Sequence, residues 1–233
     1  MTMYQLRRSD DRGKADHGWL KSHHTFSFAE YYDTAFMGFR ALRVINEDHV
    51  AAGGGFPTHP HRDMEILTYM VSGELEHRDT LGNGALIRRG ELQYMSAGTG
   101  IRHSEFNPHA QEIAHLLQIW VMPDREGHPP AYGQKSFLSQ LEAGQLTLLA
   151  SQGGRGESLK VHQDMSLWGG WMAPGNVVLP LESDRYGWLQ MVKGRARFGG
   201  EILHAGDAMA VGAEEAPVLA LLEDCEFLFF DLA

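Results

Sequence analysis

Short apolar runs, broken by glycine and proline, dominate the hydrophobic pattern of the chain. Typical runs cover residues 39–45, 65–71 and 115–121, and each is about as long as one β-strand. The chain has 27 glycines and 9 prolines, which end such runs at short intervals. This pattern predicts an antiparallel sandwich or barrel. One segment, 135–142, has the pattern of a short helix, and Gly144 stands where that helix would end.

A pattern in the first half of the chain recurs in the second half. The matching pairs of segments are 69–76 (YMVSGELE) with 190–197 (QMVKGRAR), and 86–91 (LIRRGE) with 202–207 (ILHAGD). Each half therefore contains a strand, a glycine turn, a strand, a glycine–acid turn and another strand. We predict two copies of one β-barrel unit, covering residues 1–130 and 131–233. The polar stretch 123–133, rich in proline and glycine, is the expected junction.

Charge and cysteine content limit the classes of partner and compartment. Lys and Arg number 20 against 30 Asp and Glu, a net charge of −10, whereas a nucleic-acid-binding surface needs clustered positive charge. The single cysteine, Cys225, cannot form an intramolecular disulfide, and its apolar surroundings predict a buried thiol. The longest apolar runs, such as 218–222, are shorter than the ~20 residues of a membrane helix, and no signal-peptide pattern occurs. We expect a cytoplasmic protein that binds neither nucleic acid nor membrane.

Two pairs of metal-ligand residues stand out. His59 and His61 are two residues apart, as are His103 and Glu105, and a strand presents such pairs on one face about 6.6 Å apart. An isolated His-x-His is more often a pair of surface histidines. Two pairs, however, supply three nitrogens and one carboxylate oxygen, a set that suits Fe(II), Mn, Ni, Cu or Zn. Four protein ligands leave an octahedral metal two open positions, which favours catalysis or small-ligand binding over a structural role.

These residues lie in a pattern that resembles the two cupin motifs and, more narrowly, the pirin family. The spacing is G53-x5-H59-x-H61-x3-E65-x7-G73, followed by G90, G98, H103 and N107. The segments that resemble pirins are HPHRDME (59–65), SAGTGIRHSE (96–105), GW (18–19), HTFSF (24–28) and MGF (37–39). The resemblance implies an all-β bicupin, with two antiparallel jelly-roll barrels and little helix. It further implies a metal only in the N-terminal barrel, and the second copy of the repeat here has no His-x-His.

Two carboxylates compete for the fourth ligand position. Glu65 occupies the place of the usual cupin ligand, whereas the resemblance to pirins implies Glu105. Glu105 shares a face with His103, but Glu65 lies about 13 Å beyond His61 on an extended strand and would need a bulge to reach the metal. We predict His59, His61, His103 and Glu105 as ligands. For Glu65 the alternative is an acceptor that orients a ligand histidine.

The resemblance also implies an activity. Bacterial relatives of pirin are associated with quercetin 2,3-dioxygenase activity, in which O2 cleaves the heterocyclic ring of a flavonol and carbon monoxide leaves. The expected cofactor is one divalent transition metal, Fe(II), with Mn, Ni, Cu, Zn and Co as alternatives, and Glu105 is the expected general base. The alternative is an iron-dependent, redox-responsive protein-binding module like the eukaryotic pirins. No linker or tail in the sequence supports a protein partner, so the expected partners are a flavonol-like aromatic substrate and O2.

The remaining histidines and aromatic residues have simpler interpretations. The single histidines are expected to be surface or hydrogen-bonded structural residues; they are His77, His109, His115, His128, His162 and His204. Phe28, Met37 and Phe56 either line the pocket above the metal or belong to the ordinary core.

Overall fold

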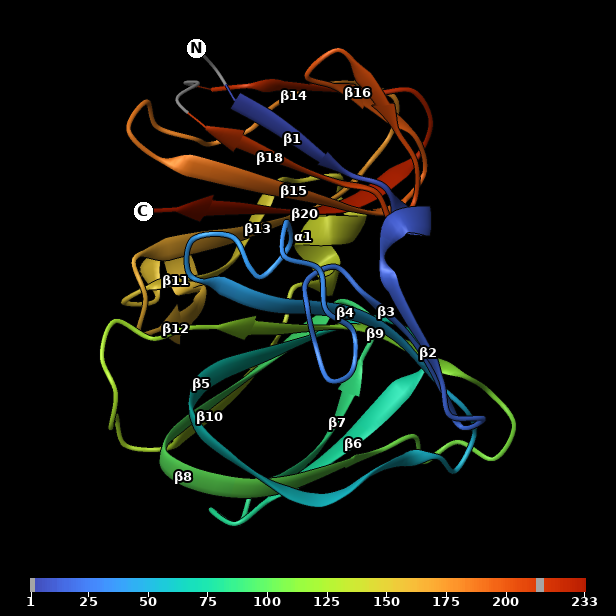
Figure 1. Ribbon diagram of the computed structural model, residues 1–233, viewed down its shortest axis with the longest axis vertical. Coiled ribbons are helices and arrows are strands. Elements are labelled where there is room, and N and C mark those ends of the chain that lie inside the picture. Colours follow the sequence, from blue (N-terminus) through green and yellow to red (C-terminus); the bar gives the residue numbers. More distant parts are fainter. Residues whose placement is uncertain (1–2, 213–215) are drawn as a thin grey trace. The chain divides into compact units, whose positions relative to one another are not determined.

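Antiparallel strands build almost the whole protein in the computed structural model, which describes residues 3–212 and 216–233 (Figure 1). The chain divides into two compact units. The N-terminal unit comprises Gly13–Leu138 and Val161–Gln163. The C-terminal unit comprises the segment up to Arg12, Ser139–Lys160 and Asp164–Ala233. This all-β organisation with little helix confirms the predicted fold class.

The N-terminal unit is a nine-stranded antiparallel sheet in the order β2-β3-β4-β9-β5-β8-β6-β7, with β10 paired to β8. Its strands are β2 (Gly13–Asp16), β3 (Leu20–His24), β4 (Leu42–Val50), β5 (Gly55–Ser72), β6 (Glu74–Asp79), β7 (Gly84–Arg88), β8 (Glu91–Phe106), β9 (Ala114–Val121) and β10 (Ala131–Ser136). β5 and β8 are the longest, with 18 and 16 residues, and they pair along most of their length. A core cluster of this sheet includes Leu20 on β3, Met70 on β5 and Leu116 on β9.

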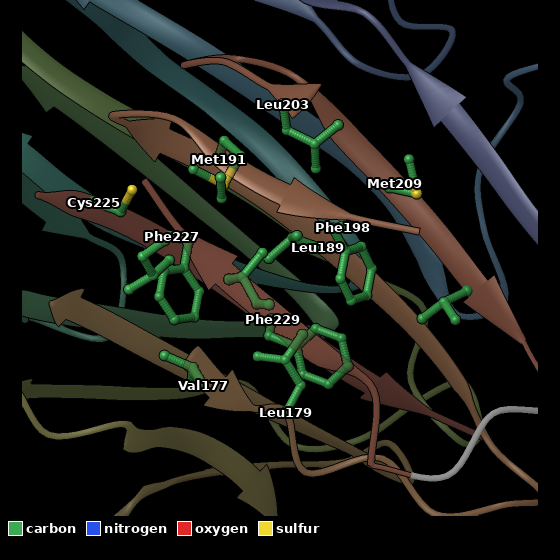
Figure 2. Packing of buried hydrophobic residues seen from close by; sticks show 14 of the residues in the cluster. Val177, Leu179, Leu189, Met191, Phe198, Leu203, Met209, Cys225, Phe227 and Phe229 are labelled. Atoms are coloured by element: carbon green, nitrogen blue, oxygen red, sulfur yellow. The ribbon is translucent and has the colours of Figure 1, made fainter. Parts of the chain in front are cut away.

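The C-terminal unit combines a seven-stranded sheet, β1-β18-β15-β20-β13-β11-β12, with a four-stranded sheet, β14-β19-β16-β17. Its strands are β1 (Met3–Arg7), β11 (Thr147–Gln152), β12 (Leu159–Val161), β13 (Met165–Met172), β14 (Gly175–Val178), β15 (Tyr186–Lys193), β16 (Ala196–Phe198), β17 (Glu201–Leu203), β18 (Ala208–Gly212), β19 (Val218–Leu221) and β20 (Cys225–Leu232). Two 3₁₀ turns cover Ser9–Asp11 and Arg155–Glu157. Phe227 and Phe229 on β20 pack with Leu189 and Met191 on β15 (Figure 2). Cys225 is buried at the edge of this cluster, as predicted.

The glycine turns of the internal repeat occupy equivalent places in the two units. Gly73 separates β5 from β6, and Gly194 separates β15 from β16. Their φ angles are +75° and +82°, which residues with a side chain rarely adopt. A Cβ atom at either glycine would lie within 3 Å of a backbone oxygen. The repeat therefore marks turns at which both the backbone angle and the close approach of another segment require glycine.

The bounds of the two units differ from the predicted division between residues 130 and 131. β1 pairs with β18, so the first strand belongs to the C-terminal unit. β10 pairs with β8 and remains in the N-terminal unit, which Val161–Gln163 also joins. These additions depend on pairing between strands that are far apart in the sequence, and a linear pattern of apolar residues carries no information about such pairs.

The predicted helix over 135–142 is shorter than expected. α1 covers Leu138–Glu142 only, because Lys135 and Ser136 belong to β10 and pair with Leu92 and Glu91. Strand pairing at the edge of the sheet thus replaces the first turn of the helix. Gly144 follows the helix with a φ of +70°, as the sequence predicts. Among the residues that the structure describes, no helix is long and apolar enough to cross a membrane.

Candidate metal centre

Three of the predicted ligands converge on the paired strands β5 and β8. His59 is directly opposite His103 across the β5–β8 ladder, and His61 shares the face of His59. The ring centroids of these three histidines are 4.4 to 4.8 Å apart. One ligand atom from each lies within 4.8 Å of the others. Two histidines from one strand and one from its neighbour therefore form a compact group of nitrogen donors.

The protonation of these histidines suits metal binding. Burial, with the neighbouring His59, lowers the pKa of His61 to about 4. Burial and the surrounding histidines lower the pKa of His103 to about 2. The backbone oxygen of Pro57 lies 2.8 Å from Nδ1 of His59 and accepts a hydrogen bond from it, so Nε2 is the nitrogen that can bind a metal. Neutral imidazoles with free lone pairs are the form in which histidine binds a metal.

Glu105, the fourth predicted ligand, is buried two residues after His103 on β8. Its Oε2 accepts a hydrogen bond of 2.8 Å from Nε2 of Gln118. Burial raises the pKa of Glu105 to about 7, because the fold removes water from the carboxylate. One ligand atom each of Glu105, His103 and His77 lie within 4.8 Å of one another. His103 therefore belongs to two groups of possible metal ligands.

The unsatisfied atoms at this centre fit a cation. Nε2 of His103 and Oε1 of Glu105 are buried and have no hydrogen-bond partner within the described part of the chain. Leaving buried polar atoms unpaired is unfavourable, and a bound cation would satisfy both. Three imidazole nitrogens and a carboxylate oxygen form a donor set that a first-row divalent metal accepts. The residues present therefore fit one such ion.

The side chain of Glu65 lies on the face of β5 opposite to that of His59 and His61. The register of β5 and β8 shifts between His61 and Asp63, and Asp63 has a φ of +61°. This irregularity breaks the alternation of faces: Ile66, not Glu65, joins the cluster of Ile101 and Trp120. A bulge is thus present, but it turns Glu65 away from the three histidines.

The buried Glu65 carboxylate has three hydrogen bonds of its own. It accepts from the hydroxyl of Tyr94 at 2.5 Å, and from the backbone nitrogen and Nδ1 of His162 at 2.8 and 2.7 Å. Burial and the adjacent carboxylate raise the pKa of Tyr94, so its hydroxyl stays protonated and donates. Glu65 does hold a histidine, as the alternative interpretation anticipated, but that histidine lies outside the predicted ligand set. Its contacts bind the segment Val161–Gln163 to the N-terminal unit.

With this geometry established, comparison with known proteins identifies the family. The pirin family model matches residues 5–121, and the model of the quercetinase C-terminal cupin domain matches residues 148–232. The chain belongs to the pirin family. The curated quercetin 2,3-dioxygenase of Escherichia coli K12 is 49% identical over 232 residues, which cover 99% of each chain. A pirin-like protein of Caulobacter vibrioides is 40% identical and spans 99% of this chain and all of its own.

Solved structures of other pirins have the same fold. The Escherichia coli pirin YhhW is 48% identical and superposes with a TM-score of 0.95, over 99% of this chain and 98% of its own. Its complex with nickel(II) superposes with a TM-score of 0.94 and covers 99% of both chains. A quercetin 2,3-dioxygenase of Acinetobacter baumannii, at 19% identity and a TM-score of 0.79, shares the fold.

This pirin has a cavity of about 800 Å³ whose lining includes Gln118 but none of the four predicted ligands. Phe28, Phe56 and Trp19 contribute apolar walls, and Asp48 and Gln118 contribute polar groups. Gln118 connects the cavity to the centre, because its Nε2 donates to Glu105. The sequence predicted either a pocket or a core position for Phe28, Phe56 and Met37. Phe28 and Phe56 line the cavity. Met37 is 40% exposed and does not line it.

Sequence reasoning missed two residues beside the centre, His77 and Asp79 on β6. His77 is fully buried, and its Nε2 lies 3.2 Å from Oδ2 of Asp79. Burial lowers the pKa of His77 despite the nearby carboxylate, so its ring is neutral. Burial alone would raise the pKa of Asp79. Hydrogen bonds from Asn83, His77 and Leu81 stabilise the carboxylate by more, so the pKa is lowered. The spacing His-x-Asp on a strand was the available signal, since it places both side chains on one face.

Proposed function

We propose that this pirin is a metal-dependent dioxygenase that cleaves the heterocyclic ring of quercetin-like flavonols with O2 and releases carbon monoxide. The observation that supports it most directly is the convergence of His59, His61 and His103. Glu105 follows two residues after His103, and its Oε1 has no hydrogen-bond partner within the described chain. The similarity to the quercetin 2,3-dioxygenase of Escherichia coli K12 supports quercetin and O2 as substrates. We propose Fe(II) as the metal, and nickel(II) is the ion in the complex of YhhW.

In this proposal, His59, His61, His103 and Glu105 hold one divalent metal in the N-terminal unit. The N-terminal unit is then the metal-binding cupin barrel, and the C-terminal unit is a degenerate copy. Every candidate group of metal ligands among the described residues lies in the N-terminal unit. A bound metal supplies Lewis-acid polarisation, which lowers the pKa of a substrate hydroxyl.

The chain itself provides a proton acceptor for that hydroxyl. Oε1 of Glu105 has no hydrogen-bond partner among the described residues, and the pKa of about 7 suits proton transfer near neutral pH. Gln118 donates a hydrogen bond to Oε2 of Glu105 and so fixes the orientation of the carboxylate and of its Oε1. We therefore propose Glu105 as a ligand through this oxygen and, when the oxygen leaves the metal, as the general base for the flavonol 3-hydroxyl.

The cavity is the proposed substrate pocket. Its volume of about 800 Å³ lies within the usual range for small-molecule sites, and its aromatic walls suit a flat ring system. Asp48 lines it with a side chain that is 2% exposed, and Oδ1 of Asp48 has no hydrogen-bond partner within the described residues. A substrate hydroxyl that donates to Asp48 would satisfy this atom and orient the ring.

The decisive test follows turnover in the purified protein. The chain is loaded with Fe(II) without oxygen, bound metal is quantified, and quercetin and air are added while O2 and carbon monoxide are measured. We expect one carbon monoxide per O2 consumed, lost in His61→Ala. His204→Ala, an exposed histidine of the C-terminal unit, is the matched control and should behave as wild type. Stoichiometric metal without carbon monoxide would reject this reaction and favour a redox-responsive protein-binding module.

A further inference from the structure

The buried side chains of Asp79 and His77 form a chain of contacts that ends at His103. Oδ2 of Asp79 lies 3.2 Å from Nε2 of His77, and Nδ1 of His77 lies 3.5 Å from Nδ1 of His103. The side chains of His77 and Asp79 are both 0% exposed. Nε2 of His103, at the far end of this chain of contacts, has no partner among the described residues.

Strand pairing fixes this arrangement. β6 pairs with β8 so that Asp79 is opposite His103 and His77 is opposite Glu105. Asp79 is also the first residue of a tight turn, where its Oδ1 accepts from the backbone nitrogens of Leu81 and Asn83 at 2.9 and 3.0 Å. The carboxylate therefore has a fixed place, and the histidine that it contacts has little freedom to rotate.

The hydrogen-bonding capacity of these groups allows one consistent arrangement of protons. An ionised carboxylate only accepts, so Nε2 of His77 carries the proton that it shares with Asp79. A neutral imidazole has a single N–H, so Nδ1 of His77 is an acceptor. The side-chain Nε2 of Gln93 also lies 3.5 Å from this Nδ1, as a second donor would. A proton on Nδ1 of His103 faces this acceptor, whereas a lone pair there would face the lone pair of His77. With the proton on Nδ1, Nε2 of His103 keeps its lone pair.

We propose that Asp79 and His77 are positioning residues that set the tautomer of His103 and so direct its Nε2 lone pair to the metal. The inference rests on the proposed metal site and extends it to residues that are not ligands. Partners behind a ligand histidine orient its ring, fix its tautomer and raise its basicity. Here the carboxylate acts through an intervening histidine.

Asp79→Asn tests the proposal with little change of shape. The Asn oxygen can keep the two backbone hydrogen bonds of the turn. Its amide group replaces Oδ2, so it loses the hydrogen bond from Nδ2 of Asn83 and donates to Nε2 of His77. His77 would then carry its proton on Nδ1, and His103 would be forced to protonate Nε2. We expect the affinity for nickel(II), measured without substrate, to fall about 10- to 100-fold, with an unchanged circular dichroism spectrum.

Asp33→Asn is the matched control. Asp33 also caps a turn, because its Oδ1 accepts from the backbone nitrogen of Ala35 and its Oδ2 accepts from Tyr31. Asp33 lies between β3 and β4, outside the strands β5, β6 and β8 that carry the predicted ligands, His77 and Asp79. This variant should bind nickel(II) as wild type does. Wild-type affinity in Asp79→Asn would overturn the proposal.

Two His77 variants separate positioning from simple packing. In His77→Gln the amide can donate to Asp79 and its oxygen can accept from His103, so we expect affinity within a few-fold of wild type. His77→Leu has neither group and should lose affinity as Asp79→Asn does. Equal losses in the Gln and Leu variants would mean that His77 packs or binds the metal itself, and would reject the relay.

The tautomer itself can be measured in metal-free protein by long-range nitrogen–proton NMR of the imidazole rings. We expect the proton of His103 on Nδ1 in wild type and on Nε2 in Asp79→Asn. A wild-type proton on Nε2 would overturn the inference. This measurement needs neither metal nor quercetin, so absence of carbon monoxide release would reject the proposed reaction and leave the relay standing.

Discussion

Replacing Asp48 by Asn should make the metal-free protein more stable near neutral pH. Burial raises the pKa of Asp48 to about 6, with a smaller contribution from Glu47, and a hydrogen bond from Ser22 opposes the rise. The ordinary value is 3.8, so the folded chain holds this proton more tightly than the unfolded chain does. The resulting stabilisation is complete below pH 3.8 and is lost as the pH rises through 6.

The magnitude follows from the two pKa values. The difference between 3.8 and about 6 corresponds to about 3 kcal/mol of stability lost by pH 7.5. Asn has nearly the shape of the protonated acid and does not ionise. Asp48→Asn should therefore match wild type near pH 4 and exceed it by about 3 kcal/mol at pH 7.5.

Urea unfolding of chelator-treated protein at both pH values measures this difference. With a typical dependence on urea, 3 kcal/mol moves the midpoint by about 1 M. A midpoint difference between variant and wild type that does not change with pH would refute the reasoning, because the effect would then not arise from ionisation. If Asp48 also orients the substrate, the same variant should bind quercetin more weakly while being more stable, as expected of a residue kept for function.

Three further variants test individual contacts. Glu105→Gln should retain part of the bound metal and lose carbon monoxide release, and full activity with metal bound would exclude Glu105 as the base. Glu65→Ala leaves buried donors of Tyr94 and His162 unpaired and should lower stability by about 3 kcal/mol, with metal content by mass spectrometry unchanged. Gly98→Ala should lower the melting temperature and the yield of folded protein, because φ is +47° and its Cβ would lie 2.0 Å from the backbone oxygen of His128. Unchanged stability in the Glu65 or Gly98 variant would contradict these assignments.

The local pattern of the sequence was sufficient for the features that depend on neighbouring residues. Alternation along a strand puts His59 and His61 on one face, and the structure keeps them together. Glycines followed by apolar runs predicted turns, and Gly73 and Gly194 adopt the positive φ angles of such turns. These features persist in the fold because backbone geometry over two to four residues depends little on the rest of the chain.

Tertiary structure alone decided the features that depend on strand pairing. The pairing of β6 with β8 brings His77 and Asp79 behind His103, and no spacing in the sequence links this pair to His103. His162 reaches Glu65 from 97 residues away. The positive φ of Asp63 turns Glu65 away from the centre, which a regular strand would not do. The sequence by itself determined the chemical identity of the candidate ligands; the pairing of distant strands determined which groups surround them, because burial and hydrogen bonding depend on neighbours in space.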